Sequence, residues 1–192
     1  MSKLIIGLVG QAGCGKGTMA DLLQTEYGAG YFRFSAILSG ILDRLALEKT
    51  REHFTALSET LRKTFGEDVL SYAIANEALH APQDVVILDG IRRVEDIVGL
   101  EPLPLFKLVA IDADPKLRYE RMKNRGEKAS EKNFTWEQFL AEEQLPTEVT
   151  IPFVMKRATK TLTNNGSREE FETTVHGFMS ELGFHSAKKN AS

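Results

Sequence analysis

The feature that most constrains the fold of this chain is a glycine-rich loop that follows an apolar run near the N-terminus. The run is residues 4–9 (LIIGLV), and the loop is residues 10–18 (GQAGCGKGT). Glycines let successive backbone N–H groups turn toward phosphate oxygens, and a following helix adds its positive N-terminal end. A lysine at this spacing brings a mobile cation to the terminal phosphates. The order of strand, loop and helix predicts a phosphate-binding site, whose candidate residues are Gly10, Gly13, Cys14, Gly15, Lys16, Gly17 and Thr18.

The end of the loop departs from the usual pattern, in which Ser or Thr directly follows the lysine. Here Gly17 takes that place and Thr18 comes one residue later. This Gly-Lys-Gly-Thr ending resembles the phosphate loop of adenylate kinases and related nucleotide kinases. The resemblance implies an ATP-dependent phosphotransferase that uses ATP and Mg²⁺, with Lys16 catalytic and the Thr18 hydroxyl near the metal.

Length and composition exclude several classes of protein. A chain of 192 residues fits one domain, here 1–192, and a net charge of −3 gives no basic field for nucleic acid or an anionic membrane. No stretch approaches the roughly 20 apolar residues of a membrane-spanning helix. The single cysteine, Cys14, cannot form an internal disulfide. We therefore expect a cytoplasmic protein, monomeric or homodimeric, that binds small molecules.

Apolar runs alternate with amphipathic stretches along the chain. Continuous apolar runs are typical of parallel strands buried on both faces, so the alternation predicts an α/β fold with a five-stranded parallel sheet and helices on both faces. In such sheets, ligands bind at the carboxyl ends of the strands. The expected strands are 3–9, 30–34, 84–88, 105–111 and 159–163. The expected helices are about 16–27, 36–48, 51–65, 67–80, 92–99, 115–125, 135–145 and 167–182.

Two insertions interrupt the plain alternation. One is the helical block 36–80, and the other is the polar segment 126–134. In a three-layer kinase fold of the type that the resemblance implies, these places hold the acceptor-binding region and a short lid. Closure of a lid over the phosphates excludes water, which would otherwise compete as the acceptor.

An acid and two arginines follow the third expected strand, in the run Asp89-Gly90-Ile91-Arg92-Arg93. An aspartate at the tip of a buried strand can hold Mg²⁺, and arginine grips phosphate with a planar fork. The run resembles the Asp-Gly-Phe-Pro-Arg motif of adenylate kinases, in which Arg93 is the matching arginine. It also resembles the Asp-Gly-Ile-Arg of archaeal dephospho-CoA-kinase-like nucleotide kinases, in which Arg92 matches. Both arginines remain acceptor candidates, and Asp89 is a catalytic and metal-binding candidate.

Three further arginines, at 118, 121 and 125, are spaced by three and four residues, which places them along one helical face. Cations there suit the charge on a transferred phosphoryl group. Similar kinases have arginines matching Arg121 and Arg125, whereas Arg118 has the weakest match. Further arginines of adenylate kinases are replaced here by Gln and Glu residues within 138–144, for which Lys156, Arg157 or Lys160 could substitute. The loop at Asn164 matches the segment that wraps the nucleotide base in these kinases.

The sequence says less about which residues bind the phosphate acceptor. Ser35 opens the helical block and is a substrate-binding candidate, but the next arginine in the chain is Arg44, followed by Arg51 and Arg62. The residues alone do not distinguish which of these three faces the acceptor.

Two classes of acceptor fit the resemblance. A hydroxyl acceptor benefits from a carboxylate that takes its proton, whereas a phosphate acceptor needs only positioning and charge neutralisation. Bacterial dephospho-CoA kinases carry an aspartate soon after the second strand, but the first acid here is Asp43. The sequence therefore favours a nucleoside monophosphate, with dephospho-CoA as the alternative. A third alternative is a slow nucleotide-binding switch, which would be a binding protein and not a kinase.

Overall fold

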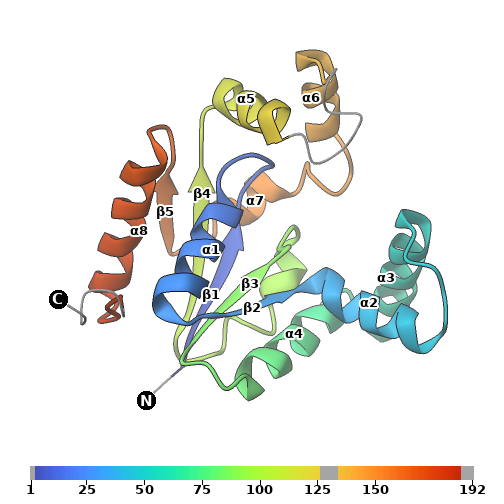
Figure 1. Ribbon diagram of the computed structural model, residues 1–192. Coiled ribbons are helices and arrows are strands. Elements are labelled where there is room, and N and C mark those ends of the chain that lie inside the picture. The colour runs from blue at the N-terminus through green and yellow to red at the C-terminus, as the bar shows by residue number, and fades with distance from the viewer. Residues whose placement is uncertain (1–2, 126–133, 187–192) are drawn as a thin grey trace.

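The computed structural model describes residues 3–125 and 134–186 (Figure 1). Its centre is a parallel five-stranded sheet with the strand order β2-β3-β1-β4-β5. This confirms the predicted fold class. The strands are β1 (Leu4–Val9), β2 (Gly30–Arg33), β3 (Val85–Asp89), β4 (Phe106–Asp112) and β5 (Lys160–Thr163).

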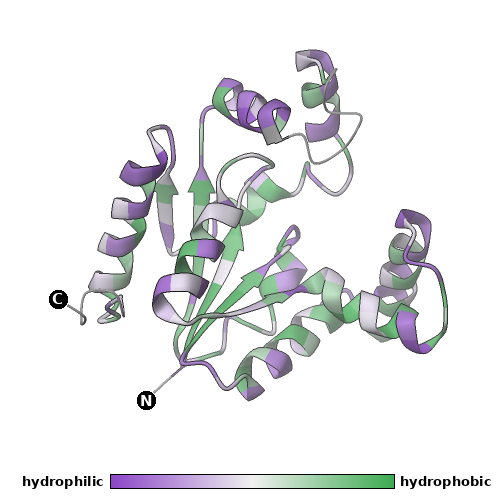
Figure 2. Ribbon diagram, in the orientation of Figure 1, coloured by the Kyte–Doolittle hydropathy of each residue, from purple (hydrophilic) through white to green (hydrophobic). Residues whose placement is uncertain are grey.

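Side chains of the central strands point alternately to the two faces of the sheet, and each face has its own core. In β1, Leu4, Ile6 and Leu8 enter one core, and Ile5 and Val9 enter the other. Because every residue of β1 is buried, the strand reads as a continuous apolar run in the sequence. The sheet shows as the green centre of Figure 2.

The helices form a layer on each face of the sheet. On one face lie α1 (Lys16–Tyr27) and α8 (Arg168–Glu181), which contribute Met19, Leu23 and Phe171 to the first core. Helices α2 (Phe34–Arg44), α4 (Val69–His80) and α7 (Ile151–Met155) supply apolar residues to the second core. Helices α5 (Pro115–Arg125) and α6 (Trp136–Glu143) lie beyond the carboxyl end of β4 (Figure 1).

The helical block 36–80 divides into two parts. Helix α4 packs on β2 and β3 and belongs to the core, whereas α3 (Arg51–Phe65) packs against α2 and α4. Within α3, Arg62 is the buried residue. The part of the block that stands away from the sheet is therefore α3 (Figure 1).

The structure departs from the expected elements in three places. The helix expected over 92–99 is a single turn of 3₁₀ helix, η1 (Val94–Ile97). Helix α2 ends at Arg44 rather than 48, because Ala46 takes a left-handed φ of 54°. Helix α7 was not expected, since its five residues give too short a pattern to stand out. Most of the segment expected as a lid, residues 126–133, lies outside the described residues.

Candidate phosphate-binding site

The loop after β1 has a backbone that only glycine fits without strain at three points. At Gly10, a Cβ would lie 2.4 Å from the carbonyl oxygen of Ile111. Gly13 has a φ of 77°, and a Cβ there would lie 2.6 Å from the carbonyl oxygen of Arg118. Gly15 has a φ of 111°, and a Cβ there would lie 2.2 Å from the amide nitrogen Nδ2 of Asn164. Gly17 has open space within 4 Å. The neighbouring chain therefore requires glycine at positions 10, 13 and 15, and Gly17 is left facing open space at the start of α1.

Lys16 folds back over the loop that precedes it. Its Nζ donates to the carbonyl oxygens of Gly10 at 2.6 Å and Gln11 at 3.3 Å, and lies 3.8 Å from Cys14 Sγ. The Cys14 side chain is buried in the first core. Its backbone therefore shapes the loop while its thiol serves packing.

Asn164 and Arg121 meet at the opposite side of the loop. The buried Asn164 donates from Nδ2 to the carbonyl oxygen of Cys14 at 2.8 Å. Arg121 donates to the backbone oxygen of Asn164 at 3.0 Å and to its Oδ1 at 3.2 Å. Burial lowers the pKa of the Arg121 guanidinium, which nevertheless stays charged at neutral pH. The structure thus brings together the loop, α5 and the turn before α8.

The three arginines of α5 do not act as one row of cations. Arg118 is buried, and its guanidinium donates to Glu143 Oε1 at 2.6 Å and to the carbonyl oxygen of Ala113 at 3.1 Å. The guanidinium of Arg118 therefore makes its hydrogen bonds to other protein groups, whereas that of Arg121 contacts Asn164. Arg125 is the last residue of α5, and its side chain lies outside what the structure describes.

Asp89 ends β3, which pairs directly with β1, so its carboxylate lies at the same sheet edge as the loop. Its Oδ2 accepts from the Tyr31 hydroxyl at 2.7 Å, and its Oδ1 accepts from the Gly90 N–H at 2.8 Å. Burial, followed by this hydrogen bond to Asp89, raises the pKa of Tyr31, so the hydroxyl remains a donor. Tyr31 belongs to no motif in the sequence, and it reaches Asp89 because β2 pairs with β3.

Thr18 and Asp89 offer the oxygen donors that Mg²⁺ requires. Mg²⁺ commonly takes one or two protein oxygens and completes its shell with water and phosphate oxygens. Thr18 is half-buried in the first turn of α1, and each Asp89 oxygen accepts one protein hydrogen bond and so retains a free lone pair. This donor set fits a magnesium ion that is shared with bound phosphates.

Arg92 and Arg93 extend from a clamped backbone. Asp96 Oδ2 accepts from the backbone N–H groups of both arginines, at 2.9 and 3.0 Å. Their side chains are half exposed and form ion pairs, Arg92 with Glu148 at 3.3 Å and Arg93 with Glu67 at 3.4 Å. Exposed pairs of this kind are weak, so either arginine can exchange its carboxylate for a phosphate.

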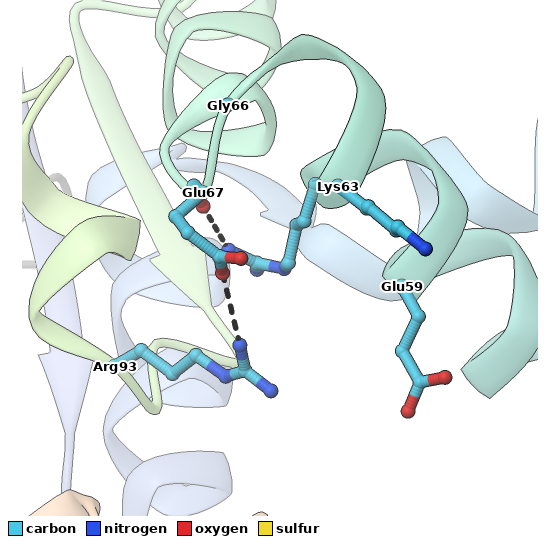
Figure 3. A pocket seen from close by; sticks show the side chains of 6 residues that line it. Glu59, Lys63, Gly66, Glu67 and Arg93 are labelled. Carbon is cyan, nitrogen blue, oxygen red and sulfur yellow. Dashed lines mark hydrogen bonds and ion pairs between the residues drawn. The ribbon is translucent and has the colours of Figure 1, made fainter.

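Arg93 borders two hollows of about 540 and 520 Å³ that share Glu67. The first also includes Glu59, Arg62, Lys63 and Gly66, and Figure 3 shows Arg93 and Glu67 directed toward each other across it. The second also includes Val94, Glu95, Pro146, Thr150 and Phe153. Both hollows lie on the side of α3 and α7, away from the residues of the loop.

Of the three arginines of the helical block, only Arg62 reaches this region. It is buried, and it forms an ion pair with Asp96 at 2.7 Å. Arg44 donates to the carbonyl oxygen of Gly40 on its own helix, and Arg51 is exposed at the start of α3. Ser35 is exposed in the first turn of α2.

Two of the cations suggested as substitutes for the missing arginines, Arg157 and Lys160, lie at the edge of the sheet opposite the phosphate loop. Lys160 is the first residue of β5 and pairs with Glu181, and Arg157 pairs with Glu101 ahead of β4. Because the strands are parallel, these residues are at the amino edge, opposite the loop. They cannot complete an arginine cage there.

The fold is that of P-loop kinases, as solved structures of similar shape indicate. A protein titled TT1252 from Thermus thermophilus has a TM-score of 0.61 at 21% identity, covering 95% of this chain and 99% of its own. Shikimate kinase from Bacteroides thetaiotaomicron also has a TM-score of 0.61, at 14% identity, covering 94% of this chain and 99% of its own. These likenesses define a kinase-like P-loop fold.

Sequence comparison shows the family to which this chain with a kinase-like P-loop fold belongs. The AAA domain family matches residues 9–137, which include the loop. A UPF0200 protein of Thermococcus kodakarensis is 31% identical over 141 residues, covering 71% of this chain and 75% of its own. Another, from Hyperthermus butylicus, is 27% identical over 180 residues, covering 94% of this chain and 95% of its own. The chain belongs to the AAA domain family and to the UPF0200 proteins.

Proposed function

We propose that this protein transfers the γ-phosphoryl group of ATP to a nucleoside monophosphate. The observation that carries the proposal is the adjacency of β1 and β3, which sets Asp89 beside the loop that holds Lys16. A cation and a metal-binding carboxylate at one sheet edge are the parts that phosphoryl transfer requires.

Each residue has a role in this reaction. The N–H groups of residues 10–18 and the end of α1 hold the phosphates of ATP, and Asn164 and Arg121 flank the side where the base would lie. Thr18 and Asp89 would hold Mg²⁺, which supplies charge neutralisation to the phosphates when bound. Lys16 exchanges the carbonyl oxygen of Gly10 for a phosphate oxygen.

The transfer itself needs no proton acceptor when the acceptor is a phosphate. An acceptor phosphate oxygen attacks Pγ, the bond from Pγ to the β,γ-bridging oxygen breaks, and ADP leaves. Arg92 or Arg93 releases its carboxylate partner and binds the acceptor phosphate. The two oxygens of Asp89 already accept hydrogen bonds, which suits cation binding better than proton removal.

A screen of acceptors tests the proposal. AMP, CMP, UMP, GMP, their deoxy forms and dephospho-CoA are each supplied with Mg-ATP, and products are identified by mass. We expect a nucleoside diphosphate from at least one monophosphate. Exclusive phosphorylation of dephospho-CoA would replace this proposal with a hydroxyl-acceptor kinase. Equal ATP hydrolysis with every acceptor and with none would support a nucleotide-binding switch.

A further inference from the structure

The phosphate loop is tied by its side chains to α6, a helix that supplies none of the predicted catalytic residues. Gln11 donates from Nε2 to Glu143 Oε1 at 2.7 Å, and Arg118 donates to the same oxygen at 2.6 Å. Arg118 also donates to the carbonyl oxygen of Ala12, at 3.4 Å. One carboxylate oxygen of α6 thus joins Gln11 to Arg118, and Arg118 in turn contacts the next loop residue, Ala12.

This junction is charged, and it is buried on the Arg118 side and half-buried on the Glu143 side. The side chain of Arg118 is 3% exposed and that of Glu143 is 18% exposed. A buried ion pair has a fixed geometry, because each charge depends on its partner and its remaining hydrogen bonds. The ion pair therefore holds Glu143 in place, and Glu143 in turn holds the side chain of Gln11 in the loop.

An aromatic cluster fixes α6 on α5. The Arg118 guanidinium lies 5.2 Å from the centre of the Phe139 ring, and Tyr119 lies 5.5 Å from Trp136 in an edge-to-face arrangement. Trp136 and Phe139 stack at 5.1 Å. A shift of α6 would therefore change the surroundings of Trp136, the single tryptophan of the chain.

We infer that Glu143 is a positioning residue that couples α6 to the phosphate loop through Gln11 and Arg118. Bound phosphate fixes the loop backbone at residues 10–18, and Glu143 passes that constraint to α6. Nucleotide binding then changes the surroundings of Trp136, and the position of α6 sets the affinity for the nucleotide. This inference rests on the proposed binding of Mg-ATP at the loop.

The test measures binding and coupling separately in the full chain. Calorimetry with Mg-ATP reports binding, and the emission of Trp136 reports coupling to α6. In the wild type we expect binding accompanied by a change in Trp136 emission. Binding without that change overturns the coupling and leaves the proposed function standing, whereas no binding by calorimetry overturns both.

Variants then locate the coupling. Gln11→Met keeps the size of the side chain and the buried Arg118–Glu143 pair, so the fold is retained. We expect about a tenfold rise in the Kd for Mg-ATP and a reduced Trp136 response, with the melting temperature unchanged. Glu143→Gln should act in the same direction, and the double variant should be no weaker than the worse single one.

Glu142→Gln is the matched control, because Glu142 is the exposed neighbour of Glu143 on the same helix. It should bind Mg-ATP as the wild type does. A wild-type Kd in Gln11→Met, with the full Trp136 response, would overturn the inference. So would additive losses in the double variant, or a Glu143→Gln protein that melts earlier but keeps its Kd and its emission change.

Discussion

Arg62 and Asp96 form a buried ion pair with 2.7 Å between Arg62 Nη2 and Asp96 Oδ1, and this pair joins α3 to the backbone that carries Arg92 and Arg93. Arg62 also donates to the carbonyl oxygen of Glu67, the residue whose carboxylate faces Arg93. The two candidate acceptor arginines are thus positioned by a helix that stands away from the sheet. Their placement depends on the charge of Arg62.

Breaking this pair should be costly. Asp96→Ala leaves the Arg62 charge unpaired and frees two backbone N–H groups, so we expect a loss of about 3–5 kcal/mol in the free energy of unfolding, measured in urea. Arg157→Ala is the control, because its pair with Glu101 is exposed and should contribute about 0–1 kcal/mol. Equal losses in the two variants would contradict the assigned role of Asp96.

Lys16→Met should abolish phosphoryl transfer and leave the fold intact. Removing a charge that contacts the transferred group costs on the order of a thousandfold in kcat, which is about 4 kcal/mol of barrier. Turnover is measured by ADP release, and circular dichroism checks the fold. Lys160→Met, at the opposite edge of the sheet, should keep wild-type turnover. Full activity in Lys16→Met would remove the loop from the reaction.

The glycines of the loop should differ sharply in their tolerance of a methyl group. Gly13→Ala forces a left-handed residue against the Arg118 carbonyl oxygen, which costs about 1–3 kcal/mol of strain and should weaken Mg-ATP binding. Gly17→Ala places alanine in open space inside α1 and should stabilise the fold by roughly 0.5–1 kcal/mol. Thermal melts and calorimetry with Mg-ATP measure both, and the reverse order would refute the loop geometry.

Arg92→Ala and Arg93→Ala should separate the two candidate acceptor arginines. Their backbone remains clamped by Asp96, so truncation removes the side chain beyond Cβ and leaves the backbone in place. The variant that loses the acceptor contact should raise the KM for the monophosphate about tenfold and leave the KM for ATP unchanged. Steady-state kinetics with each substrate varied makes the distinction. Wild-type acceptor kinetics in both variants would place the acceptor elsewhere.

Tyr31→Phe should lower the free energy of unfolding by about 1 kcal/mol and reduce turnover, because Asp89 loses the donor that orients it. The folded-state pKa of Tyr31 is raised, so its contribution is fully present below the ordinary tyrosine pKa of about 10 and is lost as pH rises above it. Urea unfolding between pH 8 and about 11 tests this. The gap between wild type and variant should narrow at the alkaline end, and a constant gap would contradict it.

The sequence was sufficient for features that depend on local pattern. The strand-loop-helix order, the five strands and the extent of α1 follow from apolar runs and glycine spacing, and the structure confirms them. The contacts of Arg118 could not be anticipated, because helical spacing predicts a shared face but not what packs against it. Tyr31 and Asp96 were missed for a related reason, since strand pairing and one helix turn bring them to their partners. Such long-range contacts depend on the folded topology.

The place of β1 in the middle of the sheet has a consequence for the nascent chain. β1 is synthesised first, but its two neighbours are β3 and β4, which end at Asp89 and Asp112. Until both have left the ribosome, the most apolar strand of the protein has an open edge of unpaired N–H and C=O groups. Such edges pair readily with other chains. Synthesis of this protein therefore includes a long interval in which β1 is open to pairing with other chains, and the arrival of β4 ends that interval.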